Sequence, residues 1–134
     1  MWKDWDGKPF DRCSLFYKEW TIEASQLEIE MDKEFFALLN KLNVSTKHIE
    51  TLLEHYEATD AAGMTDKIQC IDSLSTILSP MKQVEGGWIP DFGSRYFTED
   101  FPFGLRALCE LAIDNTIHCP NLLRVYEWGK SKIE

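Results

Sequence analysis

The 134-residue sequence lacks several features that define whole classes of protein. No apolar run approaches the roughly 20 residues that cross a bilayer, and the N-terminal stretch MWKDWDGKPF has no apolar core of a signal peptide. Positive charge is scarce, since 14 lysines and arginines face 23 acidic residues and leave a formal net charge of -9. Because this charge repels phosphate backbones and anionic lipids, we expect a soluble, cytoplasmic protein that binds neither nucleic acid nor membranes.

Two further absences concern metals and cofactors. The four cysteines have no C-x-x-C spacing and three of them lie in apolar periodic segments, so we expect reduced, packed thiols and no metal site. No G-x-G-x-x-G motif follows a predicted strand, so the sequence has no dinucleotide fingerprint. We therefore expect this chain alone to bind no cofactor.

Apolar residues, in contrast, are plentiful. The sequence is 44% hydrophobic and 13% aromatic, which suffices for the core of one domain. The apolar spacing is helical almost throughout, with Thr21, Ser45 and Thr65 as candidate caps. We expect five helices, at about 21–42, 46–58, 66–79, 102–114 and from residue 120 onward.

Two segments depart from the helical pattern. Residues 1–20 are rich in aromatic and turn-forming residues, so we expect an irregular, packed segment. Residues 80–98 combine several glycines and prolines with aromatic side chains, which predicts a long loop that is functional or packed rather than regular structure. The sequence thus predicts an all-α, five-helix, bundle-like domain with an irregular N-terminal segment and a long aromatic loop before the fourth helix.

The run GSRYFTEDFPFG places one arginine and two acids at the start of the fourth helix. Proline suits a first helical position and restricts the residue before it, so we expect Phe101 as the cap and Pro102 as the first helical residue, with Asp100 just outside. Arg95 could simply pair with Glu99 or Asp100 near the positive end of the helix. Alternatively, its rigid fork could grip a substrate carboxylate while one acid orients a catalytic histidine.

The first predicted helix carries several acids. We expect four glutamates on its solvent-facing side: Glu23, Glu28, Glu30 and Glu34.

The run SRYFTEDFPFGL, followed by LCELA and by Cys119-Pro120, resembles the C-terminal helical domain of the octopine/nopaline (opine) dehydrogenase family. Two earlier stretches are similar to that family in the same order, WKDWDGKPF with LFYKEW, and EMDKEFFALLNKLNV. The resemblance covers nearly all of residues 1–134, which we interpret as one opine dehydrogenase-like helical substrate domain.

The resemblance implies a reaction and a set of roles. Such enzymes reductively condense an amino acid with a 2-oxo acid such as pyruvate, and hold NAD or NADP on a separate N-terminal Rossmann domain. The resemblance implies that Arg95, at the matching position, would hold the 2-oxo acid carboxylate. Asp100 would be the partner of a catalytic histidine, whose protonated form it favours. Trp5, Tyr96 and Glu99 are further substrate-binding candidates. The family's histidine and Rossmann domain are absent from this chain, so we expect it to be inactive alone.

Several alternatives stay open. Trp5 could line an amino-acid pocket or belong to the core, and Asp32 could face the cleft, as its family position implies, or the solvent. The whole chain could be the substrate-binding half of an opine-type oxidoreductase, or a free-standing interaction module whose aromatic loop 88–97 binds another protein. It could form a homodimer or dock only on its own cofactor domain.

Overall fold

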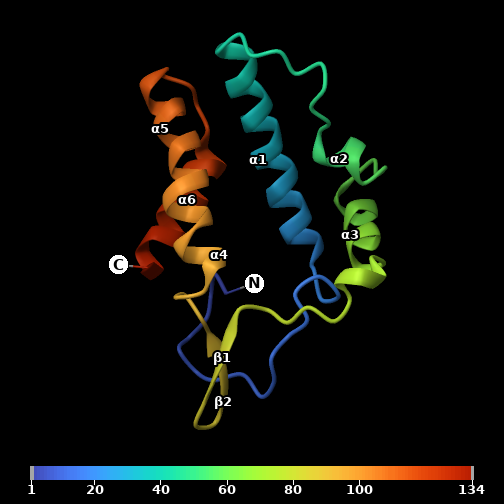
Figure 1. Cartoon of the computed structure of the whole chain (residues 1–134), viewed down its shortest axis with the longest axis vertical. Helices are drawn as coiled ribbons and strands as arrows, with labels where there is room; N and C mark the ends of the chain where they lie inside the picture. Colours follow the sequence, from blue (N-terminus) through green and yellow to red (C-terminus); the bar gives the residue numbers. More distant parts are fainter. Residues whose placement is uncertain (1, 134) are drawn as a thin grey trace.

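A computed structural model describes residues 2–133, so both terminal residues of the predicted 1–134 domain lie outside the described part. The described chain is mostly helical, which confirms the predicted fold class (Figure 1). The helices are α1 (Ile22–Lys41), α2 (Leu52–His55), α3 (Ala61–Gln69), α4 (Arg95–Thr98), α5 (Arg106–Asp114) and α6 (Pro120–Ile133). They are joined by a 3₁₀ turn (Asp72–Leu74), strands β1 (Met81–Val84) and β2 (Gly87–Pro90), and a π turn (Asp100–Leu105).

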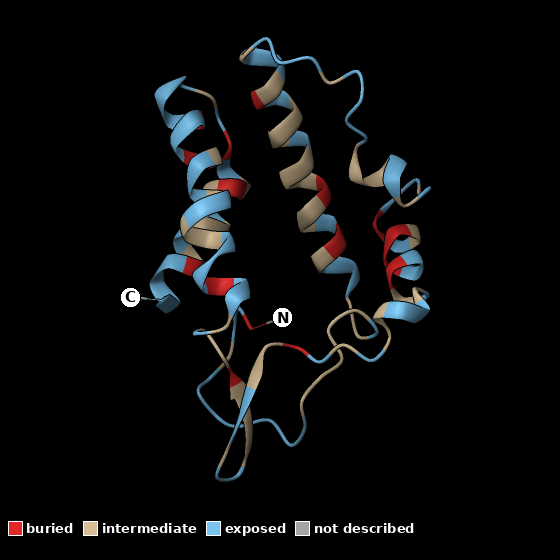
Figure 2. Ribbon diagram, in the orientation of Figure 1, coloured by how far each residue is buried: buried red, intermediate tan, exposed pale blue. Residues whose placement is uncertain are grey.

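α1 lies between two groups of helices, with α2 and α3 on one side and α5 and α6 on the other (Figure 1). Each side has its own core, and Figure 2 shows buried positions on both. Leu38, which is fully buried, packs with Cys109, Ala112, Cys119 and Leu122. On the other side, Ile29 packs with Ala61, Met64 and Ile68. Because both sides are covered, α1 buries a wider surface than one apolar stripe.

α1 begins where the sequence predicts. The side chain of Thr21 accepts a hydrogen bond from the backbone N–H of Ala24 at 3.2 Å, as an N-cap residue should.

The predicted second and third helices were placed wrongly. The second is a single turn, capped by Thr51 rather than Ser45, and Thr51 and Glu54 form a reciprocal capping box. It ends at His55, and Glu57, two residues later, has a left-handed backbone φ of 50° that cannot continue the helix. The third begins after Asp60, whose carboxylate accepts the N–H of Gly63. Local capping by these residues outweighed the apolar spacing on which the prediction was based.

Thr65, the predicted cap of the third helix, lies inside α3 instead. Its buried hydroxyl donates to the carbonyl oxygen of Ala61 at 2.7 Å and lies 2.7 Å from the hydroxyl of Ser25 on α1. This buried contact links the two helices, because polar groups removed from water need hydrogen-bond partners.

Residues 80–98 are not the unstructured loop that the sequence predicts. β1 and β2 form an antiparallel hairpin in which Lys82 lies opposite Ile89. Glu85 and Gly86 form its turn, and Gly87 begins β2; the two glycines have φ of 89° and 137°, values that glycine adopts without strain. A β-carbon on Gly87 would also clash with the backbone of Phe10, which exchanges two hydrogen bonds with Trp88. The glycine pair therefore builds the hairpin instead of breaking regular structure.

The start of the fourth helix also differs from the prediction. Phe101 is not its cap, because α4 begins at Arg95 after Ser94, and the π turn connects it to α5. Pro102 has no N–H to donate and its ring crowds the carbonyl oxygen four residues before it. The chain accommodates Pro102 by widening one turn rather than by ending the helix, as is usual at π bulges.

The N-terminal segment is irregular and packed, as expected. Residues 2–20 contain turns and isolated bridges to the later chain, and Trp2 is buried. Across the described residues, no helix combines the length and apolar character needed to cross a membrane.

Candidate functional site

Arg95 and Glu99 form a two-pronged ion pair on the surface of α4. The guanidinium Nε and Nη2 of Arg95 lie 3.0 and 3.1 Å from the two carboxylate oxygens of Glu99. The pair is exposed, since the Arg95 side chain is 85% accessible. The hydrogen bonds from Arg95 lower the pKa of Glu99, and the same contact raises the pKa of Arg95. Its planar fork, which suits carboxylates, is therefore occupied by a carboxylate from its own helix.

Asp100 follows this pair as the first residue of the π turn. Its side chain is exposed, and its charge adds to that of Glu99 in raising the pKa of Arg95. The structure thus brings Arg95, Glu99 and Asp100 together, but places Asp100 within the helical segment rather than before it.

Tyr96 and Trp5 lie apart from this charged group. The ring of Tyr96 is 41% exposed and lies 5.5 Å from the ring of Phe16. The indole N–H of Trp5 donates to the carbonyl oxygen of Lys8 at 2.7 Å. Trp5 lines a groove together with residues of the hairpin, of α4 and of the end of α6. The two side chains therefore contact surfaces other than the Arg95 fork, and their substrate-binding roles stay predictions.

The aromatic side chains of residues 88–97 pack mostly within the domain. Phe92 lies 6.3 Å from the ring of Trp2 and 5.0 Å from that of Phe97. Phe97 is buried, and within this segment only Tyr96 is a large exposed hydrophobic residue. These contacts give the segment a structural role in joining the hairpin to α4 and α6.

The prediction that four glutamates of α1 face solvent is wrong for Glu28. This side chain is half-buried on the side of α2 and α3, near Tyr17 and Tyr56, whose pKa values are raised mainly by burial and further by the charge of Glu28. Burial, and then the nearby charge of Asp32, raise the pKa of Glu28 to about 7. An acid with this pKa changes its charge near neutral pH, although the sequence pattern gave no sign of it.

Glu34 and Asp32 of α1 are also turned inward. The carboxylate of Glu34 accepts hydrogen bonds from the backbone N–H groups of Asn121 and Leu122 and from the side-chain amide of Asn121, at 2.7 to 3.1 Å. It therefore caps the N-terminus of α6 from another helix. Asp32 accepts the N–H of Leu52 at 3.1 Å, so it binds the start of α2 rather than facing a cleft or solvent.

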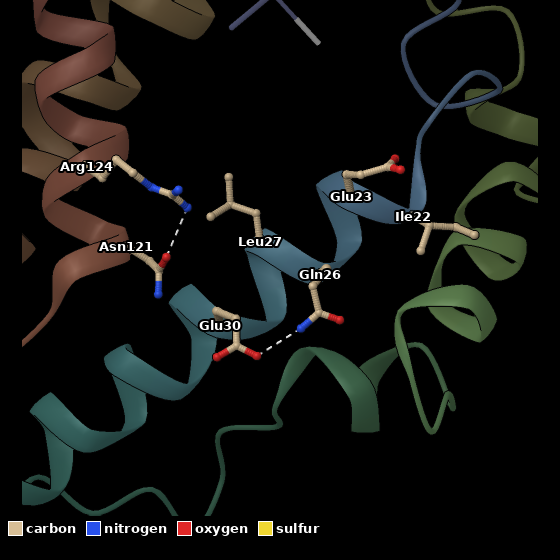
Figure 3. Close-up of a pocket in the computed structure, with 7 residues that line it drawn as sticks. All are labelled: Ile22, Glu23, Gln26, Leu27, Glu30, Asn121 and Arg124. Atoms are coloured by element: carbon tan, nitrogen blue, oxygen red, sulfur yellow. Dashed lines mark hydrogen bonds between the residues drawn. The ribbon is translucent and has the colours of Figure 1, made fainter.

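A groove of about 390 Å³ lies between α1 and α6, and Arg95, Glu99 and Asp100 do not line it (Figure 3). Most of its polar side chains are already hydrogen-bonded, and Asn121 also donates to Glu34. Gln26 donates to Glu30 at 2.9 Å, and Arg124 donates to Asn121 at 3.0 Å. Since the groove contains none of the predicted site residues, it does not contribute to the candidate site.

The described residues contain no glycine turn of the kind that binds dinucleotide phosphates in Rossmann domains. Their two strands form one antiparallel hairpin, and its glycine turn joins strand to strand. Dinucleotide phosphates are instead bound where a glycine turn joins a strand to a helix. Within the same residues, no cluster of three or more histidine, cysteine or acidic side chains is placed to hold a metal. All four cysteines are free thiols; Cys70 is exposed, and burial raises the pKa of Cys109 to about 11.

Comparison with known proteins matches most of the chain to one family. Residues 6–133 match the family described as NAD/NADP octopine/nopaline dehydrogenase, alpha-helical domain. The chain is 30% identical to the tauropine dehydrogenase of Arabella iricolor, over 96% of this chain and 36% of that protein.

Two solved structures of octopine dehydrogenase have the same fold. One, with NADH and pyruvate, superimposes with a TM-score of 0.86 at 26% identity, over 98% of this chain and 34% of that one. The other, with NADH and L-arginine, gives a TM-score of 0.85 at 27% identity, over 98% and 36%. The chain spans about a third of the length of these relatives, and it belongs to the octopine/nopaline dehydrogenase family as that family's α-helical domain.

Proposed function

We propose that this chain is the substrate-binding helical domain of an NAD(P)-dependent opine-type dehydrogenase. The reaction is the reductive condensation of an amino acid with a 2-oxo acid such as pyruvate. Membership of the family supports this proposal, as do relatives solved with pyruvate or L-arginine. The chain spans about a third of such enzymes, so we assign the cofactor to a separate Rossmann domain and expect no activity from this chain alone.

The observation that carries the proposal is the exposed pair of Arg95 with Glu99. A buried pair would be costly to open, whereas a pair in contact with water is held weakly. A 2-oxo acid carboxylate can therefore replace Glu99 on the same two guanidinium nitrogens at little cost, as long as the displaced Glu99 carboxylate stays in water. Glu99 keeps the fork extended and aligned until the substrate arrives.

In this proposal, Asp100 is the partner of a histidine supplied from outside this chain. Its exposed carboxylate, next to the Arg95 fork, is accessible to a second domain. A carboxylate beside a histidine favours the protonated imidazole, which can donate a proton to the substrate. Arg95 would thus bind the 2-oxo acid, while Asp100 would orient the histidine that donates the proton.

A chimaeric enzyme tests these roles. This chain would replace the helical domain of an octopine dehydrogenase, and pyruvate-dependent oxidation of NADH would be measured. We expect Arg95→Ala to raise the KM for pyruvate at least tenfold, because a bidentate, charge-assisted contact is lost.

The matched control for this experiment is Arg106→Ala. Arg106 forms the same kind of exposed pair, with Glu110 four residues later and 2.7 Å away, but on α5. Equal kinetics for the Arg95 and Arg106 variants would contradict the proposed role of Arg95.

A further inference from the structure

Gly129 allows α6 to approach the π turn unusually closely. This residue is buried within the helix, and a β-carbon built on it would overlap the ring of Phe101. Glycine is unfavourable inside a helix, and no left-handed backbone requires it here. The close approach of the Phe101 ring therefore accounts for glycine at position 129.

The ring of Phe101 is held by several neighbours at once. It stacks on the ring of Phe97, with centroids 5.5 Å apart and planes within 4° of each other. Trp128 of α6 lies 6.2 Å away, and its buried indole N–H has no acceptor within residues 2–133. Trp128 is thus retained for its packing rather than for a hydrogen bond. Together, these contacts give the Phe101 side chain a single position.

The π turn depends on this anchoring, because its own backbone cannot complete the helical hydrogen bonds. Pro102 supplies no N–H, and the wider turn leaves room for more than one arrangement. Asp100 directly precedes Phe101, so the backbone that places the Phe101 ring also directs the Asp100 carboxylate.

We infer that Phe101 and Gly129 form a positioning pair, which fixes the π turn and thereby holds the Asp100 carboxylate beside the Arg95 fork. Neither residue contacts a reacting group. The role given to Asp100 rests on the proposed function, whereas the mechanical link from Gly129 through Phe101 to Asp100 does not. α6 would accordingly control the geometry of the site without contributing to it.

The test compares three variants of the 134-residue chain by NMR. Gly129→Ala forces the ring of Phe101 to move, and Gly129→Ala with Phe101→Leu replaces the ring by a smaller side chain. Gly104→Ala is the matched control, because this glycine lies in the same π turn and a β-carbon there meets nothing within 4 Å. The readout is the chemical shift of the carboxyl carbon of Asp100, with the Glu110 carboxyl carbon as an internal reference.

We expect Gly129→Ala to shift the carboxyl carbon signal of Asp100 while the Glu110 signal stays in place. The double variant should return Asp100 towards its original position, and Gly104→Ala should change nothing. If Gly129→Ala does not fold, Phe101→Leu alone provides the test, since it removes the ring that packs against Gly129 and introduces no clash. An unchanged Asp100 signal in a folded variant that lacks the original contact would overturn the inference.

Kinetics of the chimaeric enzyme separate this inference from the proposed function. Misplacing Asp100 should lower kcat by on the order of tenfold to a hundredfold with a smaller change in the KM for pyruvate, because Arg95 remains. The double variant should recover most of that loss. A chimaera with no activity would count against the proposed function, while the NMR comparison would still decide whether Phe101 and Gly129 position Asp100.

Discussion

Glu28 of α1 and Glu99 at the end of α4 are acids in opposite settings. Beside α2 and α3, Glu28 is half-buried, forms no salt bridge within residues 2–133, and has its pKa raised to about 7 by burial. At the end of α4, Glu99 is exposed, and its pKa is lowered by the hydrogen bonds from Arg95. A buried acid couples stability to pH, whereas an exposed ion pair contributes little to stability and can be exchanged for a ligand. Glu28 therefore makes the stability of the fold depend on pH, whereas the Arg95–Glu99 pair can open with little loss of stability.

The largest effect should come from the core that joins α1 to α5 and α6. We expect Leu38→Ala to lower the free energy of unfolding by about 2–5 kcal/mol, because it leaves a cavity at a fully buried position. Urea denaturation measures the loss. Leu111→Ala is the control, since Leu111 is 42% exposed and its truncation should cost far less. Equal losses would contradict the description of this core.

The next effect should depend on pH. The folded state raises the pKa of Glu28 from its usual 4.5 to about 7, so this group stabilises the protein fully below pH 4.5 and loses that contribution as pH rises through 7. Glu28→Gln removes the charge and should raise the free energy of unfolding by about 1–3 kcal/mol at pH 8, with almost no effect at pH 4.

The control for Glu28 is Glu23→Gln, since Glu23 is an exposed acid of the same helix. Thermal unfolding at both pH values would be compared for the two variants. If both show the same pH dependence, the special setting of Glu28 is refuted.

A smaller effect should follow from the cap that Glu34 provides. Glu34→Ala removes the acceptor of two backbone N–H groups of α6, which should lower the free energy of unfolding by about 1–2 kcal/mol. Hydrogen exchange should quicken at the N-terminus of α6 more than in α3. Uniform quickening in both helices would show that Glu34 does not act as a local cap.

The smallest effect on stability should come from the exposed pair. Because the Arg95 side chain is 85% accessible, Arg95→Ala should leave the unfolding midpoint unchanged, as should Arg106→Ala. A large loss of stability in the Arg95 variant alone would show that the Arg95–Glu99 pair stabilises the fold, and would contradict the view that it is free to exchange Glu99 for a ligand.

The sequence predicted the helical class, the cap of α1 and the family, because apolar periodicity and one distinctive run carry that information. It failed where distant residues decide the local structure. The partial burial of Glu28 and Glu34 could not be predicted from a single apolar stripe, because α1 is covered by other helices on two sides. The π turn escaped prediction because the contact of Phe101 with Gly129, 28 positions later, holds it.

The site was predicted in part. Arg95, Glu99 and Asp100 were singled out from their spacing, and the structure brings them together. Spacing alone did not establish that Glu99 occupies the Arg95 fork, because the predicted helix began at Pro102 and left Arg95 and Glu99 in the loop before it, whereas the structure places Arg95 in α4. The roles of these residues towards a substrate stay predictions.

The most direct test of the account is an NMR titration of the guanidinium Nε–H signal of Arg95 with pyruvate. It would use the chimaeric enzyme with NADH bound, and acetate would control for unspecific anion binding. We predict that pyruvate shifts the Arg95 signal and raises the pKa of Glu99 as its partner is withdrawn, while the Arg106 signal stays unchanged. Equal shifts at Arg95 and Arg106, or none at Arg95 under saturating pyruvate, would contradict the claim that this exposed fork binds the 2-oxo acid.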